Sequence, residues 1–78
     1  MQVIITTQSG SKYTFFEKNG EKHVIRNYMD EGIVEGDVQF ELGQPLQFKA
    51  YMLSKYEYHK ESDVSTFRST PVKKVSLL

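Results

Sequence analysis

Residues 12–25 have the sequence Lys-Tyr-Thr-Phe-Phe-Glu-Lys-Asn-Gly-Glu-Lys-His-Val-Ile, which predicts a β-hairpin closed by Asn19-Gly20. A two-residue type I′ turn needs positive φ at both central positions, and Asn and Gly tolerate that conformation best. The turn sets four cross-strand pairs: Lys18 with Glu21, Glu17 with Lys22, Phe16 with His23, and Phe15 with Val24. Two pairs of opposite charge and one aromatic–aliphatic pair favour this register. We therefore take the hairpin as the element around which the rest of the chain is organised.

Both faces of the predicted hairpin carry apolar side chains: Tyr13, Phe15 and Val24 on one face, Phe16 and Ile25 on the other. Such a hairpin needs cover on both faces, or it lies where a small sheet curls on itself. On the second face, His23 is expected to pack beside Phe16 rather than to act as a catalyst or metal ligand.

The segments on either side of the hairpin differ in pattern. Residues 2–7 are rich in β-branched side chains and predict a strand, which the Ser9-Gly10 turn joins to the hairpin as an antiparallel meander. Residues 27–36 contain two glycines and no sustained alternation. We interpret them as a loop that can include one helical turn near residues 28–31.

Alternation of apolar and polar residues returns at residue 37. In residues 37–42 the inward positions would be Val38, Phe40 and Leu42, and in residues 46–53 they would be Leu46, Phe48, Ala50 and Met52. This pattern is typical of half-buried antiparallel strands. Residues 43–45, Gly-Gln-Pro, predict the turn between them.

The last third of the chain begins with its most polar stretch. Residues 54–63 predict a long loop or the tip of a hairpin, followed by strands at 64–68 and 72–77. Pro71 indicates an edge position, a strand start or a break between two short strands. Residues 75–78 are expected to close a barrel or to pair across a homodimer. The prediction is a single all-β domain over residues 1–78, a small antiparallel barrel or sandwich of five to seven short strands with an N-terminal meander.

Composition narrows the classes of function. Ten basic and ten acidic residues cancel, and the chain has no cysteine for a disulfide or a thiolate metal site. No zinc motif, nucleophile elbow or phosphate-binding glycine loop occurs, so we expect a protein without enzyme activity, metal or cofactor. The first seven residues do not resemble a signal peptide, and no apolar run approaches 18 residues, so the expected location is the cytoplasm.

Acidic residues are concentrated in one segment. Residues 30–41 contain five carboxylates and no basic side chain, namely Asp30, Glu31, Glu35, Asp37 and Glu41. This segment could be a docking face for a basic partner or a mimic of a phosphate backbone. The alternative is a solvated face whose polar positions happen to be acidic.

A second marked segment is rich in tyrosine and lysine. The residues concerned are Lys49, Tyr51, Lys55, Tyr56, Tyr58 and Lys60, with His59 beside them. Binders of single-stranded nucleic acid stack bases on aromatic rings and place cations along the phosphates. Tyrosines are also enriched at protein interfaces, and Glu57 and Glu61 reduce the cationic character of the segment.

Three short motifs carry a resemblance. Residues 7–13 have the form T-x-S-G-S-x-Y, residues 42–48 have the form L-G-x-P-L-x-F, and residues 69–72 are Ser-Thr-Pro-Val. Together they resemble small all-β proteins encoded by phages and other mobile elements of Gram-positive bacteria. Those proteins often end in Thr-Ser-Pro-Val, so the order of the first two residues differs here. The resemblance implies a fold and a biological setting, and it transfers no catalytic residue.

The sequence thus favours a non-enzymatic protein-interaction module, a phage or mobile-element accessory protein that binds a host or phage protein. Its expected contact residues are Asp30, Glu31, Glu35, Asp37, Glu41, Tyr51, Tyr56 and Tyr58. The alternative is a β-barrel that binds single-stranded nucleic acid through Lys49, Tyr51, Lys55, Tyr56, Tyr58 and Lys60.

Overall fold

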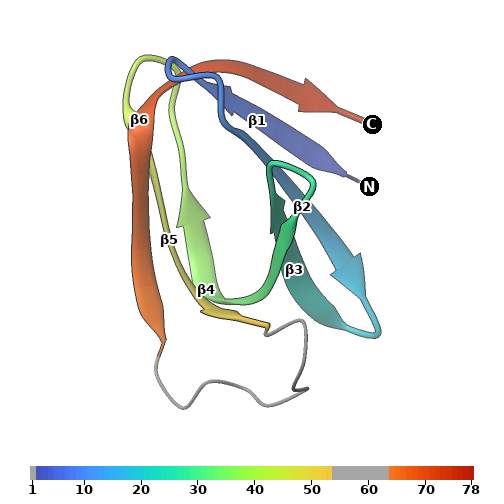
Figure 1. Ribbon diagram of the computed structural model, residues 1–78. Coiled ribbons are helices and arrows are strands. Elements are labelled where there is room, and N and C mark those ends of the chain that lie inside the picture. Colours follow the sequence, from blue (N-terminus) through green and yellow to red (C-terminus); the bar gives the residue numbers. More distant parts are fainter. Residues whose placement is uncertain (1, 54–63) are drawn as a thin grey trace.

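The computed structural model describes residues 2–53 and 64–78 and shows six antiparallel strands that close into a small barrel (Figure 1). The strands are β1 (Val3–Thr7), β2 (Lys12–Lys18), β3 (Glu21–Arg26), β4 (Asp30–Gln39), β5 (Pro45–Met52) and β6 (Ser65–Leu77). Each strand pairs with its neighbours in sequence, and β6 returns to pair with β1. The predicted all-β barrel with an N-terminal meander is confirmed. In the described part of the chain no helix is long and apolar enough to cross a membrane.

The β2–β3 hairpin has the predicted register. Lys18 pairs with Glu21, and Phe15 pairs with Val24. Asn19 and Gly20 both have positive φ, 53° and 79°, as a type I′ turn requires. Local sequence therefore determines this element.

The predicted loop at residues 27–36 is wrong, because β4 begins at Asp30 and pairs with β3 as far as Ile33. Only residues 27–29 form the turn. Gly32, which we interpreted as a loop residue, lies inside the strand and faces β5. A Cβ there would lie 2.8 Å from both the Met52 Sδ and the Tyr51 carbonyl oxygen. This glycine permits close approach of two strands, and it is not a sign of a loop.

The predicted strand at 37–42 is also corrected, because β4 ends at Gln39. Val38 is half-buried and packs against the core. Phe40 and Leu42, which alternation placed inward, are exposed. The predicted turn at residues 43–45 is confirmed, and Gly43 has φ 84° there. The predicted inward positions of β5 are also confirmed, since Leu46, Phe48 and Ala50 are buried and Met52 is half-buried.

β6 is one long strand rather than two short ones. Residues before Pro71 pair with β5, and residues from Val72 onward pair with β1. Pro71 lies where the strand changes partners, and Figure 1 shows that β6 bends along its length. Because proline has no N–H to donate, this position suits it. The pairing of Leu77 with Val3 closes the barrel.

The core is centred on Phe48 of β5. Its ring contacts Tyr13 and Phe15 edge-on, with centroids 5.8 and 5.3 Å away, and stacks on Phe67 at 5.2 Å. The buried apolar side chains are Ile5, Tyr13, Val24, Val34, Leu46, Phe48, Ala50 and Val72. Aromatic rings from β2 and β6 thus pack around one central phenylalanine of β5.

The segments that carry the three sequence motifs meet at one place, which we call the closure region (residues 7–11, 42–46 and 69–72). The Gln8 N–H donates to the Pro71 carbonyl at 2.9 Å, and the Val72 N–H donates to the Gln44 carbonyl at 2.8 Å. Side chains add to these bonds, since the Leu46 N–H donates to the Ser69 Oγ at 3.0 Å. The motifs therefore have a structural explanation, which is to join β1, β5 and β6.

Candidate binding cleft

The wall of the barrel opens between β3 and β4. The ladder between these strands ends at the pair His23–Ile33, although β3 begins at Glu21 and β4 continues to Gln39. Gly36 has φ 71°, and the β4–β5 register shifts between Glu35 and Gln39. Because positive φ bends a strand, the second half of β4 leaves β3 and follows β5 alone (Figure 1).

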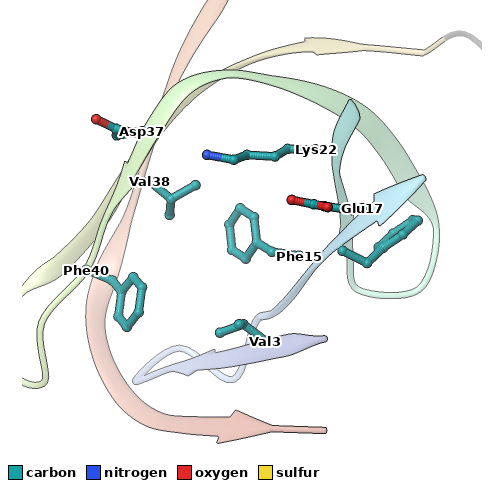
Figure 2. Close-up of a pocket in the computed structure, with 8 residues that line it drawn as sticks. Val3, Phe15, Glu17, Lys22, Asp37, Val38 and Phe40 are labelled. Carbon is teal, nitrogen blue, oxygen red and sulfur yellow. The ribbon is translucent and has the colours of Figure 1, made fainter. Parts of the chain in front are cut away.

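This opening holds a cleft of about 600 Å³. It is lined by Val3, Phe15, Phe16, Glu17, Lys22, Asp37, Val38 and Phe40. Figure 2 shows Val3, Phe15, Val38 and Phe40 around one space, with Lys22 reaching over it from the hairpin. The lining is thus mainly apolar, with charged groups at the rim.

The walls of the cleft come from different strands, and the core supports one of them. Phe15 pairs with Val3 on one side and with Val24 on the other. Its ring also contacts Phe48, so the core fixes its position. Phe40 follows the end of β4 and is 45% exposed. One wall is therefore rigid, and the other presents a phenylalanine to solvent.

The charged groups of the rim have no ionic partners within the described residues. Glu17 and Lys22 are a cross-strand pair but form no ion pair, and Asp37 forms none either. The two ion pairs of the described part, Arg26–Asp30 and His23–Glu31, lie outside the cleft. The side chains of Glu17, Lys22 and Asp37 are exposed.

A smaller hollow of about 230 Å³ lies on another side of Phe40. Its lining is more polar and consists of Gln39, Phe40, Glu41, Gln44, Pro45 and Gln47. Phe40 is common to both hollows. The two spaces therefore adjoin along the end of β4.

The structure divides the five carboxylates of residues 30–41 into two groups. Asp30 binds the Arg26 guanidinium at 3.1 Å, Glu31 contacts the His23 Nδ1 at 3.0 Å, and Glu35 accepts a hydrogen bond from Tyr51. Asp37 lies at the cleft, and Glu41 lies at the smaller hollow. Three of the five predicted contact carboxylates thus have partners within the sheet, and the other two border the hollows.

His23 has the packing role that its position in the hairpin indicated. It is 6% exposed, and its ring stacks on Phe16 with centroids 5.5 Å apart. The contact with Glu31 satisfies one ring nitrogen. Among residues 2–53 and 64–78, no group of three or more His, Cys, Asp or Glu side chains is placed to hold a metal ion.

Only part of the tyrosine-rich segment can be placed. Tyr51 and Lys49 lie on β5, whereas Lys55, Tyr56, Tyr58, His59 and Lys60 lie outside the described residues. The pKa of Tyr51 is raised by its hydrogen bond to Glu35, by burial and by the negative charge of Glu35. Lys49 is the cross-strand partner of that same carboxylate. In the described part, the predicted nucleic-acid surface therefore includes a group that repels phosphate.

Comparisons with known protein families, curated proteins and solved structures find no match for this chain. The case for a functional site therefore rests on the geometry of the cleft.

Sequence reasoning missed the cleft residues Val3, Phe15, Phe16, Glu17, Lys22, Val38 and Phe40 as a group. One signal was present: Gly36 lies directly before the alternating segment that contains Val38 and Phe40, and a glycine next to or inside a strand pattern often marks a bulge.

Proposed function

We propose that this protein is a non-enzymatic interaction module that binds a segment of a partner protein in the cleft between the β2–β3 hairpin and the second half of β4. The observation that carries the proposal is the opening itself, an apolar space in the barrel wall with the exposed ring of Phe40 on its edge. Its volume of about 600 Å³ lies within the range of pockets that bind ligands.

The arrangement of the cleft matches the general anatomy of protein interfaces. Such interfaces place aromatic and aliphatic side chains at the centre and polar groups at the rim. Here Phe15 and Val38 lie inside, and Glu17, Lys22 and Asp37 lie around them. Binding energy at interfaces is concentrated where a side chain fills a pocket of this kind. A cleft with an apolar centre suits a partner segment that contributes one large apolar side chain.

The biological setting follows from the resemblance rather than from the cleft. We propose that the module is a phage or mobile-element accessory protein and that its partner is a host or phage protein in the cytoplasm. The resemblance supports this setting, and the predicted contact residues Asp37 and Glu41 border the two hollows.

Selection of displayed random peptides tests the proposal. Peptides would be selected on the wild-type protein and then measured against Phe40→Ser and against Tyr28→Ser. Tyr28 is 75% exposed in the β3–β4 turn and lines neither hollow, so Y28S is a matched loss of an exposed aromatic ring. Circular dichroism would show that both variants stay folded.

We expect the selected peptides to bind F40S at least tenfold more weakly than wild type and to bind Y28S unchanged, as for loss of an interface hot spot. Equal binding to wild type and F40S would contradict the proposal. Failure to enrich any peptide would also contradict it.

A further inference from the structure

The cleft and the smaller hollow form one binding surface, and its two parts differ in polarity. Phe40 belongs to both, so a chain that crosses its ring enters one space from the other. The lining is mainly apolar on the cleft side, with Val3, Phe15 and Val38, and mainly polar on the other side. A ligand that fills both must therefore combine an apolar group with polar groups next to it.

The charges along this surface are unequal. The carboxylates are Glu17, Asp37 and Glu41, and the single cation is Lys22. All four side chains are exposed, and none of them belongs to an ion pair within the described residues. A cationic group on the ligand gains attraction from this excess of negative charge, whereas an anionic group is repelled.

The order of residues at the end of β4 and just after it places the charges relative to the apolar contacts. Asp37 precedes Val38, and Glu41 follows Phe40. The two carboxylates therefore bracket the apolar pair along the chain. An extended peptide advances about 3.3 Å per residue. A peptide lying along this segment therefore meets a carboxylate about two residues on either side of an anchor that lies between Val38 and Phe40.

We propose that the partner segment is an extended peptide with one aromatic or large aliphatic anchor and a lysine or arginine within two residues of it. This inference rests on the proposed function and adds the chemistry of the partner. The anchor occupies the cleft against Phe15, Val38 and Phe40, and the cation lies beside Asp37 or Glu41.

Three peptides labelled at the N-terminus test this inference, fluorescein-Gly-Lys-Phe-Lys-Gly-amide and its analogues with serine or glutamate in place of both lysines. Binding would be measured by fluorescence anisotropy at low and high salt. For exposed charges we expect the lysine peptide to bind about fivefold more tightly than the serine peptide, with the glutamate peptide weakest. The advantage of the lysine peptide should shrink as salt rises.

Variants show whether Asp37 and Glu41 cause the difference. Asp37→Asn and Glu41→Gln should each reduce the ratio of lysine-peptide to serine-peptide affinity by about twofold or more. Glu21→Gln is the control, because Glu21 is an exposed carboxylate of the hairpin that lines neither hollow and its loss changes net charge equally. An equal effect of all three variants would show only a general field and would overturn the inference.

The outcomes separate this inference from the proposed function. Equal affinity of the three peptides, abolished by F40S, would overturn the requirement for a cation and leave the cleft as the binding site. No binding of any phenylalanine peptide, together with no enrichment in the display experiment, would overturn both.

Discussion

The closure region and the cleft of this small barrel are built in different ways. In the closure region, backbone hydrogen bonds such as Gln8 N–H to Pro71 carbonyl join segments distant in sequence. At the cleft, β3 and β4 separate after the pair His23–Ile33, and side chains alone line the opening. The recognisable motifs occur where the barrel is joined, and the candidate site occurs where it is open. A short motif in a small barrel can therefore indicate how the fold is held together rather than what it binds.

The largest expected difference is in the effect of truncating an apolar residue in each region. Leu46→Ala should lower the free energy of unfolding by about 2–5 kcal/mol, because Leu46 is fully buried and its loss leaves a cavity. Phe40→Ala should cost less than about 1 kcal/mol, because the ring is already partly in solvent. Urea unfolding of both variants measures the two values. Similar losses would mean that Phe40 is part of the core.

Gly32 tests the close approach of β4 and β5. Gly32→Ala should cost about 1–3 kcal/mol, because the added Cβ meets the Met52 Sδ and the Tyr51 carbonyl oxygen. Thermal unfolding measures the loss. Gly36→Ala is the control for glycine replacement, since a Cβ there meets nothing within 4 Å and only its φ of 71° opposes the change. A smaller effect at Gly32 than at Gly36 would contradict the close approach of β4 and β5.

A smaller effect is expected from one side-chain bond of the closure region. Ser69→Ala removes the acceptor of the Leu46 N–H and should cost about 0.5–1.5 kcal/mol. Peptide binding at the cleft should not change, because Ser69 lines neither hollow. Denaturation and peptide affinity measured on the same preparation test both statements. Weaker binding by a folded S69A protein would show that the two regions are coupled.

The smallest expected effect is a change in the pKa of Tyr51. Glu35→Gln should lower the pKa of Tyr51 towards its ordinary value, because the carboxylate that accepts the phenol hydrogen bond and opposes ionisation is lost. The stability that the raised pKa contributes is present below the ordinary tyrosine pKa and is lost as the pH rises through the raised value. Tyrosinate absorbance, taken as a difference from Y51F, measures the shift. An unchanged pKa in E35Q would contradict this contact.

Local information was sufficient for some elements of this fold and insufficient for others. The turn at Asn19-Gly20 and the alternation in β5 depend on residues near in sequence, and both were predicted. Gly32 was misinterpreted because its role depends on Met52 of another strand.

Local sequence was also insufficient to predict the candidate site. Phe40 was placed inward because alternation was extended past the end of β4 at Gln39, where no sequence signal marks the end. The cleft combines residues of β1, β2, β3 and β4 that only the closed barrel brings together. By contrast, the acidic segment can be recognised in the sequence. The sequence does not show which of its carboxylates have partners, because that depends on contacts between strands such as Arg26–Asp30.

The most direct test of the cleft as the binding surface is to map the backbone amide chemical shifts of labelled protein titrated with a display-selected peptide. We predict that the shifts concentrate at Val3, residues 15–17, Lys22 and residues 36–41. Shifts concentrated instead at residues 8–11 or at the turn of residues 27–29 would contradict the account, because those residues line neither hollow.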